Sequence, residues 1–232
     1  MDFGVRRYGF HGTSHQYVSN IAMKMLAESG IDRDESRLIT CHLGNGCSIT
    51  AIQGGNVVDT SMGLTPAEGL VMGTRAGDID PAIVLFLQRE LECDSKELDN
   101  IINKKSGLLG VSGISSDMRD IEAAADRGAK RAQLALAIFC YRIKKYIGAY
   151  AAVMGGVDAI VFTGGIGENS AYVRAQSVCG LEYLGAKLNM AVNAEAKGLS
   201  ELNESDSAVK IYIIPTNEEV MIARQTAEVI NS

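Results

Sequence analysis

Three short segments rich in β-branched residues, separated only by glycine turns, constrain the fold of this 232-residue chain more than any other feature. They cover residues 37–43, 47–53 and 56–60. The breaks between them, Gly44-Asn45-Gly46 and Gly54-Gly55, contain the residue types that tolerate the positive φ of tight hairpin turns. The pattern predicts three consecutive antiparallel strands, with which a purely parallel doubly wound sheet would not begin.

Helices and two more strands are expected along the rest of the chain. Apolar residues at helical spacing predict a helix, capped by Thr13 or Ser14, that runs to about Glu28. Further helices are expected near residues 81–91, 95–104, 117–126, 129–153, 168–178 and 218–230. Further strands are expected over residues 158–163 and 209–214. Strands that alternate with helices after a meander indicate an α/β domain.

The longest expected helix, residues 129–153, should lie at the centre of the core. Its buried side is expected to consist of Leu134, Ala137, Ile138, Tyr141 and Ile147. Residues 62–80, rich in Gly, Thr and Pro, are expected to form a long loop, and long loops in compact domains are usually functional. Residues 164–167 are expected to form a glycine turn and residues 198–208 a surface loop.

Composition excludes several classes of protein. Hydrophobic residues make up 47% of the chain, which excludes a disordered protein. A net charge of −6 lacks the basic surface of a nucleic-acid-binding protein. The five cysteines have no metal-ligand or disulfide-framework spacing, and no apolar run is long enough for a signal peptide or a membrane span. We therefore expect a cytoplasmic protein that contacts neither nucleic acid nor membrane.

Two glycine-rich segments are candidate phosphate sites. The absence of a Gly-Lys dipeptide excludes a P-loop. The segment Gly164–Ser170 follows a strand and opens a helix, so its amides face either a nucleotide or only a tight turn. The GxGxxG pattern fails at Ser170, which disfavours a dinucleotide oxidoreductase. The turn between Leu43 and Ser48 holds either a phosphate or an ordinary hairpin.

Two further segments carry basic or imidazole side chains. Arg75 lies between glycines, where its guanidinium is free either to grip phosphoryl oxygens or to pair with Asp78. His11 and His15 flank the expected helix start, but their spacing matches no metal site, which favours helix capping by the residues between them.

Six blocks in this order resemble the acetate kinase family of acyl-phosphate-forming kinases over essentially the whole chain. They are residues 8–15 (YGFHGTSH), 42–46 (HLGNG), 73–78 (GTRAGD), 115–119 (SSDMR), 164–169 (GGIGEN) and 216–219 (TNEE). The resemblance implies the ribonuclease H-like fold of the actin, Hsp70 and sugar kinase superfamily, a mixed sheet with antiparallel hairpins flanked by helices. It divides the chain into a nucleotide-binding domain, residues 1–216, and a terminal helix, residues 217–232, that packs on another domain in relatives.

The resemblance also implies roles for individual residues. His11 and Arg75 would contact the transition state, and Glu218 would act with Mg²⁺. The residues implied to bind ATP or ADP are His42, Leu43, Gly44, Asn45, Gly46, Asp117, Met118, Arg119, Gly164, Gly165, Ile166, Gly167, Glu168 and Asn169.

The implied reaction is reversible transfer of the γ-phosphoryl group of ATP to acetate, which gives ADP and acetyl phosphate. Full-length relatives carry an N-terminal domain without a counterpart here, so we expect the isolated chain to be catalytically incomplete. The alternatives are a non-catalytic nucleotide-binding or dimerisation module, and a preference for propionate or butyrate. The resemblance further implies a homodimer.

Overall fold

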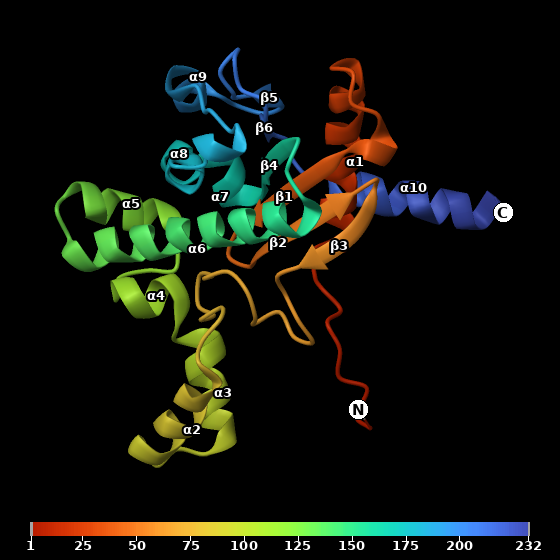
Figure 1. Cartoon of the computed structure of the whole chain (residues 1–232). Coiled ribbons are helices and arrows are strands. Elements are labelled where there is room, and N and C mark those ends of the chain that lie inside the picture. Colours follow the sequence, from red (N-terminus) through yellow and green to blue (C-terminus); the bar gives the residue numbers. More distant parts are fainter. Residues whose placement is uncertain (1, 232) are drawn as a thin grey trace.

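The computed structural model describes residues 2–231, and at its centre is a six-stranded mixed sheet in the order β3-β2-β1-β4-β6-β5 (Figure 1). The strands are β1 (Arg37–Leu43), β2 (Cys47–Gln53), β3 (Asn56–Thr60), β4 (Ala159–Thr163), β5 (Ser200–Glu201) and β6 (Lys210–Ile213). β1 pairs with β2 in antiparallel and with β4 in parallel orientation. The predicted meander is confirmed, and with it the mixed α/β sheet.

Helices cover both faces of this sheet. They are α1 (Gly12–Glu28), α2 (Pro81–Glu90), α3 (Ser95–Lys104), α4 (Gly107–Ser112), α5 (Met118–Asp126), α6 (Lys130–Met154), α7 (Gly164–Asn169), α8 (Ala171–Val178), α9 (Met190–Glu195) and α10 (Glu218–Asn231). In Figure 1, α2 and α3 project below the sheet and α10 extends to the side. None of the helices among residues 2–231 combines the length and hydrophobicity needed to cross a membrane.

Alternation along β1 divides the core into two layers. Leu38 packs with α1 residues on one face, whereas Ile39 and Cys41 pack with α6 residues on the other. On the α1 face, the side chains of β1 change from apolar to polar along the strand. Leu38 is apolar, but Thr40 and His42, which follow at the two-residue period of a strand, are polar. The polar end of this layer is where the candidate site lies.

The buried side of α6 differs from the prediction. Leu134 and Tyr141 are 53% and 64% exposed, and of the five predicted residues only Ile147 is buried. The side facing the sheet carries Leu136, Phe139, Cys140, Ile143 and Ile147. Both rows are apolar with the same helical spacing, so periodicity could not distinguish the side that packs on the sheet from the side that faces solvent.

Smaller corrections concern glycines and short elements. Residues 164–167 form the first turn of α7 rather than a separate glycine turn, because Gly164 at φ +77° lets the chain pass directly from strand to helix. The expected surface loop 198–208 contains β5 and the fully buried Leu202. The short helices α4 and α9 were not predicted either, since six residues give too little periodicity to read.

Candidate nucleotide and phosphoryl site

A cleft of about 610 Å³ opens beyond the carboxyl ends of β1 and β4. Three segments far apart in the sequence form its walls. They are the turn after β1 (Gly44, Asn45), the first half of α5 with the two residues before it (Ser116, Asp117, Met118, Arg119, Glu122) and α7 with the residue after it (Gly165, Ile166, Asn169, Ser170). Ligands of open α/β sheets usually bind beyond the carboxyl ends of parallel strands, so the cleft has the expected location.

One close approach lets the walls meet. Because β1 and β4 are parallel neighbours, their ends bring the β1–β2 turn beside the start of α7. A Cβ atom on Gly164 would lie 2.8 Å from the carbonyl oxygen of Leu43, closer than real Cβ contacts allow. Glycine at this position therefore lets the start of α7 lie against the end of β1, behind the cleft lining.

The predicted nucleotide residues divide into two groups. The structure brings Gly44, Asn45, Asp117, Met118, Arg119, Gly165, Ile166 and Asn169 together in the cleft lining. His42, Leu43, Gly46, Gly164, Gly167 and Glu168 do not line it. Leu43 is fully buried in the core, and a Glu168 carboxylate oxygen accepts a hydrogen bond from the Gly164 amide at 3.0 Å. These residues lie in the scaffold behind the cleft.

Three cleft residues received no individual role in the sequence analysis, although the first and last lie in segments that it singled out: Ser116, Glu122 and Ser170. The Ser170 hydroxyl donates to a Glu122 carboxylate oxygen and accepts from the Val173 amide, as the N-cap of α8. For Ser170 the sequence showed the end of a glycine-rich segment and the residue before a helix, and the second of these signals indicates a cap but not a place in a cleft.

An ion pair lies at the mouth of the cleft, at the N-terminus of α5. Asp117 accepts from the Arg119 amide at 2.9 Å and pairs with the Arg119 guanidinium at 2.6 Å. These hydrogen bonds from Arg119 lower the pKa of Asp117 to about 2. The Arg119 side chain is 87% exposed, so its planar guanidinium is accessible to a ligand that enters the cleft.

Arg75 and His11 converge beside the cleft, at the β1–β2 turn. A Cβ atom on Gly46 would lie 3.1 Å from Arg75 Nη2 and 3.5 Å from His11 Nε2. The loop that carries Arg75 is attached to the same turn, because the Gly73 amide donates to the Asn45 carbonyl at 3.0 Å. The two predicted phosphoryl-binding side chains thus point at one small volume next to the cleft lining.

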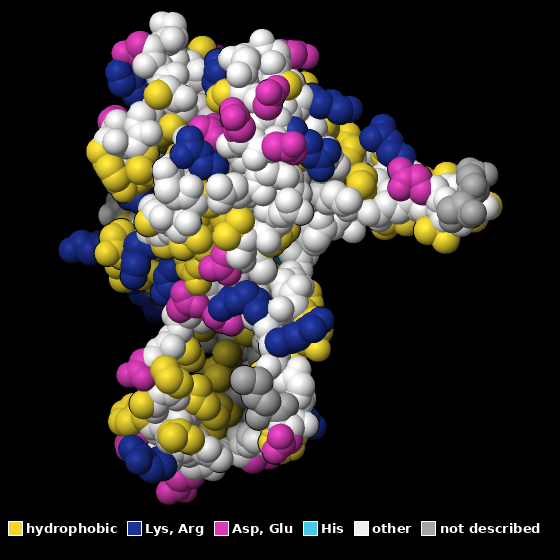
Figure 2. Space-filling model, turned by 45° about the vertical axis from the view of Figure 1, so that its right-hand side comes forward, with side chains coloured by type: hydrophobic (Ala, Val, Ile, Leu, Met, Phe, Trp, Pro, Cys, Tyr) yellow, Lys and Arg dark blue, Asp and Glu magenta, His cyan; other side chains and the backbone are white. Residues whose placement is uncertain are grey.

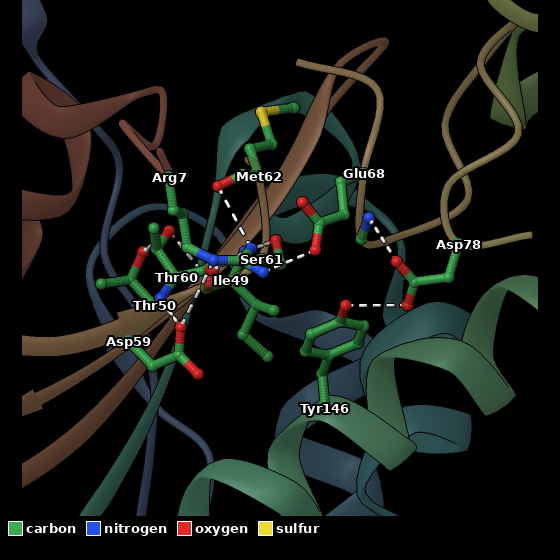
Figure 3. Close-up of polar contacts among 11 residues, drawn as sticks. Arg7, Ile49, Thr50, Asp59, Thr60, Ser61, Met62, Glu68, Asp78 and Tyr146 are labelled. Carbon is green, nitrogen blue, oxygen red and sulfur yellow. Dashed lines mark hydrogen bonds and ion pairs between the residues drawn. The ribbon is translucent and has the colours of Figure 1, made fainter. Parts of the chain in front are cut away.

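The alternative pairing of Arg75 with Asp78 is wrong. Arg75 Nη1 donates to the Pro66 carbonyl, while Asp78 pairs with Arg142 at 3.3 Å. Asp78 instead fixes the loop on α6, since it accepts from the Gly69 amide and from the Tyr146 hydroxyl, each at 2.8 Å (Figure 3). This leaves the Arg75 guanidinium without a carboxylate partner among residues 2–231.

A second set of bonds holds the other end of this loop, as Figure 3 shows. Arg7 donates to the Thr60 carbonyl at 2.8 Å and to the Met62 carbonyl at 3.3 Å. It also pairs with Glu68 at 2.5 Å. Residues 61–80 contain no helix or strand, as predicted for a long loop, but side chains anchor them at both ends.

All three histidines of the chain form one cluster, in which His11 is the ring beside Arg75. The His11 and His42 rings stack with centroids 4.1 Å apart, and His15 meets His42 edge-on at 6.3 Å. Burial, followed by the neighbouring charges, lowers the pKa of His15 to about 3 and that of His42 to about 4. Burial and the positive charge of Arg75 also lower the pKa of His11. The cluster is therefore neutral near pH 7.

The predicted cap of α1 is wrong. His11 is the N-cap, in the left-handed region at φ +57°, and no side chain caps the helix. The Ser14 hydroxyl lies instead 2.8 Å from His42 Nδ1. Serine and threonine near an apparent helix start were interpreted as caps, whereas the Ser14 hydroxyl is bonded to the histidine cluster.

Glu218 is the first residue of α10, which is capped by Asn217. Residues 2–231 contain no group of three or more His, Cys, Asp or Glu side chains that could hold a metal ion on their own. Thr216, two residues earlier, has a buried hydroxyl oxygen without a hydrogen-bond partner. A carboxylate and a hydroxyl two residues apart in the sequence are both hard oxygen donors, the type that suits Mg²⁺ with its water and phosphate ligands.

A buried arginine supports α7 from behind. The Arg174 guanidinium donates to the carbonyls of Gly167 and Glu168 at 3.0 and 2.9 Å and to Asn193 on α9 at 2.7 Å. It is 1% exposed, and burial lowers its pKa to about 10. Sequence analysis did not single out this residue, because an arginine in an amphipathic helix usually faces solvent.

Comparisons with known proteins give the same assignment as these motifs. The sequence profile of the acetokinase family matches residues 1–224. The chain belongs to the acetokinase family. An acetate kinase of Clostridium botulinum (strain Hall) is 56% identical over 226 residues, which cover 97% of this chain and 56% of that protein. This member of the family thus spans little more than half the length of such relatives.

Solved structures of family members share the fold. The crystal structure of Porphyromonas gingivalis acetate kinase matches with a TM-score of 0.95 and 49% identity, over 99% of this chain and 57% of that one. A propionate kinase from Francisella tularensis matches with a TM-score of 0.88 and 44% identity, over 97% of this chain and 56% of that one. The matched part of the family includes every segment that lines the cleft.

Proposed function

We propose that this chain binds ADP and ATP in the cleft and supplies the phosphoryl-binding half of an acetate kinase. The observation that carries the proposal is the convergence of Arg75 and His11 beside a cleft lined by Gly44, Asn45 and Gly165. A glycine turn next to a cation without a carboxylate partner is complementary to a polyphosphate. Family membership supports the same assignment.

The proposed reaction is in-line attack of an acetate oxygen on the γ-phosphorus of ATP, which gives acetyl phosphate and ADP. Phosphoryl transfer of this kind depends on positioning and on charge neutralisation. Arg75 binds equatorial oxygens of the transferred group, and His11 donates a hydrogen bond to the same oxygens from Nε2. Asn45 and the neighbouring amides bind the phosphates, while Met118, Ile166 and Gly165 contact the adenosine.

Glu218 is the proposed protein ligand of Mg²⁺, with the Thr216 hydroxyl nearby. When bound, Mg²⁺ would neutralise charge on the phosphate oxygens. The carboxylate at position 218 would then interact with the metal through its own oxygen or through water. This requires no other carboxylate of the chain, since Mg²⁺ usually retains several waters.

The acyl group and full turnover need more than these residues. The relatives named acetate kinase are almost twice as long as the stretch matched here. We therefore infer that the chain alone binds nucleotide without efficient turnover. Acetate is the proposed acyl substrate, and propionate is the alternative because one similar structure is a propionate kinase.

A homodimer is the proposed assembly, formed through the lobe of α2 and α3. None of the side chains of α2 is buried, although seven of the ten residues in PAIVLFLQRE are hydrophobic or proline. Ile83, Leu85 and Phe86 are 42%, 63% and 50% exposed. Figure 2 shows hydrophobic side chains gathered over this lower lobe. Exposed apolar patches of this kind mark contact surfaces.

The protein is further proposed to act in the cytoplasm. In the longer relatives, the helix that corresponds to α10 is proposed to pack on the part of the protein that this chain does not match.

The proposal is tested by calorimetric titration of the chain with ADP. A Cβ on Gly165 would meet nothing within 4 Å, so Gly165→Val should fold normally while its methyl groups occupy the cleft. We expect wild type to bind ADP, Gly165→Ala to bind it less tightly and Gly165→Val to lose at least about tenfold in affinity, or 1.4 kcal/mol. Gly148→Ala, in α6 away from the cleft lining, is the control. No binding, or equal binding by all variants, would exclude the nucleotide site.

A non-catalytic binding module is the second candidate. It predicts the same ADP titration but no acetyl phosphate when the chain is joined to the N-terminal part of the Clostridium botulinum relative. Acetyl phosphate formation by this chimera would decide for the kinase.

A further inference from the structure

A row of buried hydrogen bonds connects His11 to the middle of the sheet. Thr40 Oγ1 lies 2.7 Å from His15 Nδ1, His15 Nε2 lies 2.7 Å from Ser48 Oγ, and Ser48 Oγ lies 2.9 Å from His11 Nδ1. Thr40 and Ser48 are fully buried, and His15 is 3% exposed. We call Thr40, His15 and Ser48 the buried network.

Two proton arrangements give every contact a donor and also pair the Ser48 hydroxyl hydrogen, whereas acceptance by Ser48 from both histidines would leave that buried hydrogen without a partner. A neutral imidazole has one N–H donor and one nitrogen acceptor. Either every donor points toward His11, so that Thr40 donates to His15 and Ser48 donates to His11, or every donor points away from it. The first arrangement leaves His11 protonated on Nε2, and the second leaves it protonated on Nδ1.

The Thr40 hydroxyl decides between them. Its only hydrogen-bond partner among the described residues is His15 Nδ1. If His15 donated from Nδ1, the Thr40 hydroxyl hydrogen would have no acceptor in a fully buried site. A buried donor without a partner costs about 1–3 kcal/mol. The arrangement in which Thr40 donates leaves no donor of the network unpaired.

We propose that Thr40, His15 and Ser48 act as positioning residues that hold His11 as the Nε2–H tautomer, with that N–H on the side of Arg75. The Arg75 cation by itself would favour the opposite tautomer, whose Nε2 lone pair attracts a positive charge. With the buried network, an oxyanion held by Arg75 meets a donor on His11 rather than a second lone pair. This use of the tautomer rests on the proposed phosphoryl transfer; the tautomer itself does not.

The test is nitrogen-15 NMR of the full 232-residue chain labelled at its histidine rings. Two-bond couplings from ring carbon-bound protons identify which nitrogen carries hydrogen. We expect His11 and His15 to be protonated on Nε2 at neutral pH, with this form dominant by about fivefold or more. Protonation of wild-type His11 mainly on Nδ1 would overturn the inference.

Two substitutions at Thr40 separate tautomer control from packing. Thr40→Val has nearly the same shape but no donor, so His11 should become a mixture of both tautomers although Thr40 is three hydrogen bonds away. Thr40→Ser keeps the donor and should keep the Nε2–H form. An unchanged His11 spectrum in folded Thr40→Val would refute the network; if this variant does not fold, the wild-type spectrum still decides.

The failure of this inference and the failure of the proposed function are distinguishable. If ADP binds in the Gly165-dependent manner but His11 is protonated on Nδ1, only the inference is wrong. If His11 is protonated on Nε2 but the chimera makes no acetyl phosphate, the positioning stands and the kinase assignment fails. In an active chimera, Thr40→Val should lower kcat for acetyl phosphate formation with little change in KM for ATP, and Thr40→Ser should restore kcat.

Discussion

The His11 and His42 rings lie face to face, 4.1 Å apart and 16° from parallel, although one precedes α1 and the other lies on β1. Both rings are partly buried, and His15 is almost completely buried. Because these rings are neutral and packed together, protonation of the cluster at the proposed phosphoryl site should lower the free energy of unfolding.

Acid should therefore unfold the chain through His15. Its pKa is about 3 in the folded state and near 6.5 when unfolded, so the unfolded state binds more protons between these values. The contribution is complete above pH 6.5 and is lost as pH falls below it. Urea denaturation at pH 7 and pH 5 should show about 2 kcal/mol less stability at pH 5 from this group. A folded His15→Gln variant should depend less steeply on pH; an unchanged dependence would contradict the assignment.

Replacing Arg174 should loosen α7. Arg174→Met leaves the buried carbonyls of Gly167 and Glu168 without donors, so the free energy of unfolding should fall by about 3 kcal/mol. ADP affinity should fall with it, because α7 lines the cleft. Arg224→Met, at an exposed position on α10, is the matched control. A loss below about 1 kcal/mol would show that the guanidinium does not support the helix.

Removing Asp78 should free the Arg75 loop from α6. Asp78→Ala deletes the acceptor of the Gly69 amide and the Tyr146 hydroxyl as well as the partner of Arg142. Because this carboxylate is partly exposed, we expect a stability loss of only about 1 kcal/mol. Hydrogen exchange should accelerate within residues 61–80 but not in the exposed control Asp126→Ala. Equal exchange in both variants would mean that the anchor at Arg7 suffices.

Arg75 should matter for rate more than for affinity. Arg75→Ala removes a contact that strengthens in the transition state, so the chain should still bind ADP with little change. In the chimera, acetyl phosphate formation should fall by about 10³ or more. Arg75→Lys should recover only part of this loss, because an ammonium lacks the planar fork. Equal losses of affinity and rate would contradict a transition-state role.

The exposed side of α2 should control assembly. Phe86→Glu places a charge among the apolar side chains of the lower lobe and should convert a dimer into a monomer in light scattering. Leu134→Glu, at an equally exposed apolar position on α6, should leave the mass unchanged. A monomeric wild type, or dissociation by both variants, would exclude this surface.

Local patterns predicted the sheet well because its signals are local. Strands β1, β2 and β3 match the predicted bounds, since Gly44-Asn45-Gly46 and Gly54-Gly55 mark both turns. Contacts between residues far apart in the sequence could not be predicted from local patterns. Nothing local shows that Ser48 bonds both His11 and His15, or that Arg174 is buried. The prediction that the motifs converge on one site came from their resemblance to a family and not from their spacing.

The left-handed backbone of His11 has a consequence for variants at this position. Glycine would adopt φ +57° without the steric penalty of a Cβ atom, which is about 1 kcal/mol. A His11→Gly chain could thus recover part of the folding energy lost with the imidazole contacts. At position 11, glycine would favour stability of the backbone, whereas the proposed chemistry requires an imidazole. The sequence carries the imidazole despite the less favourable backbone conformation.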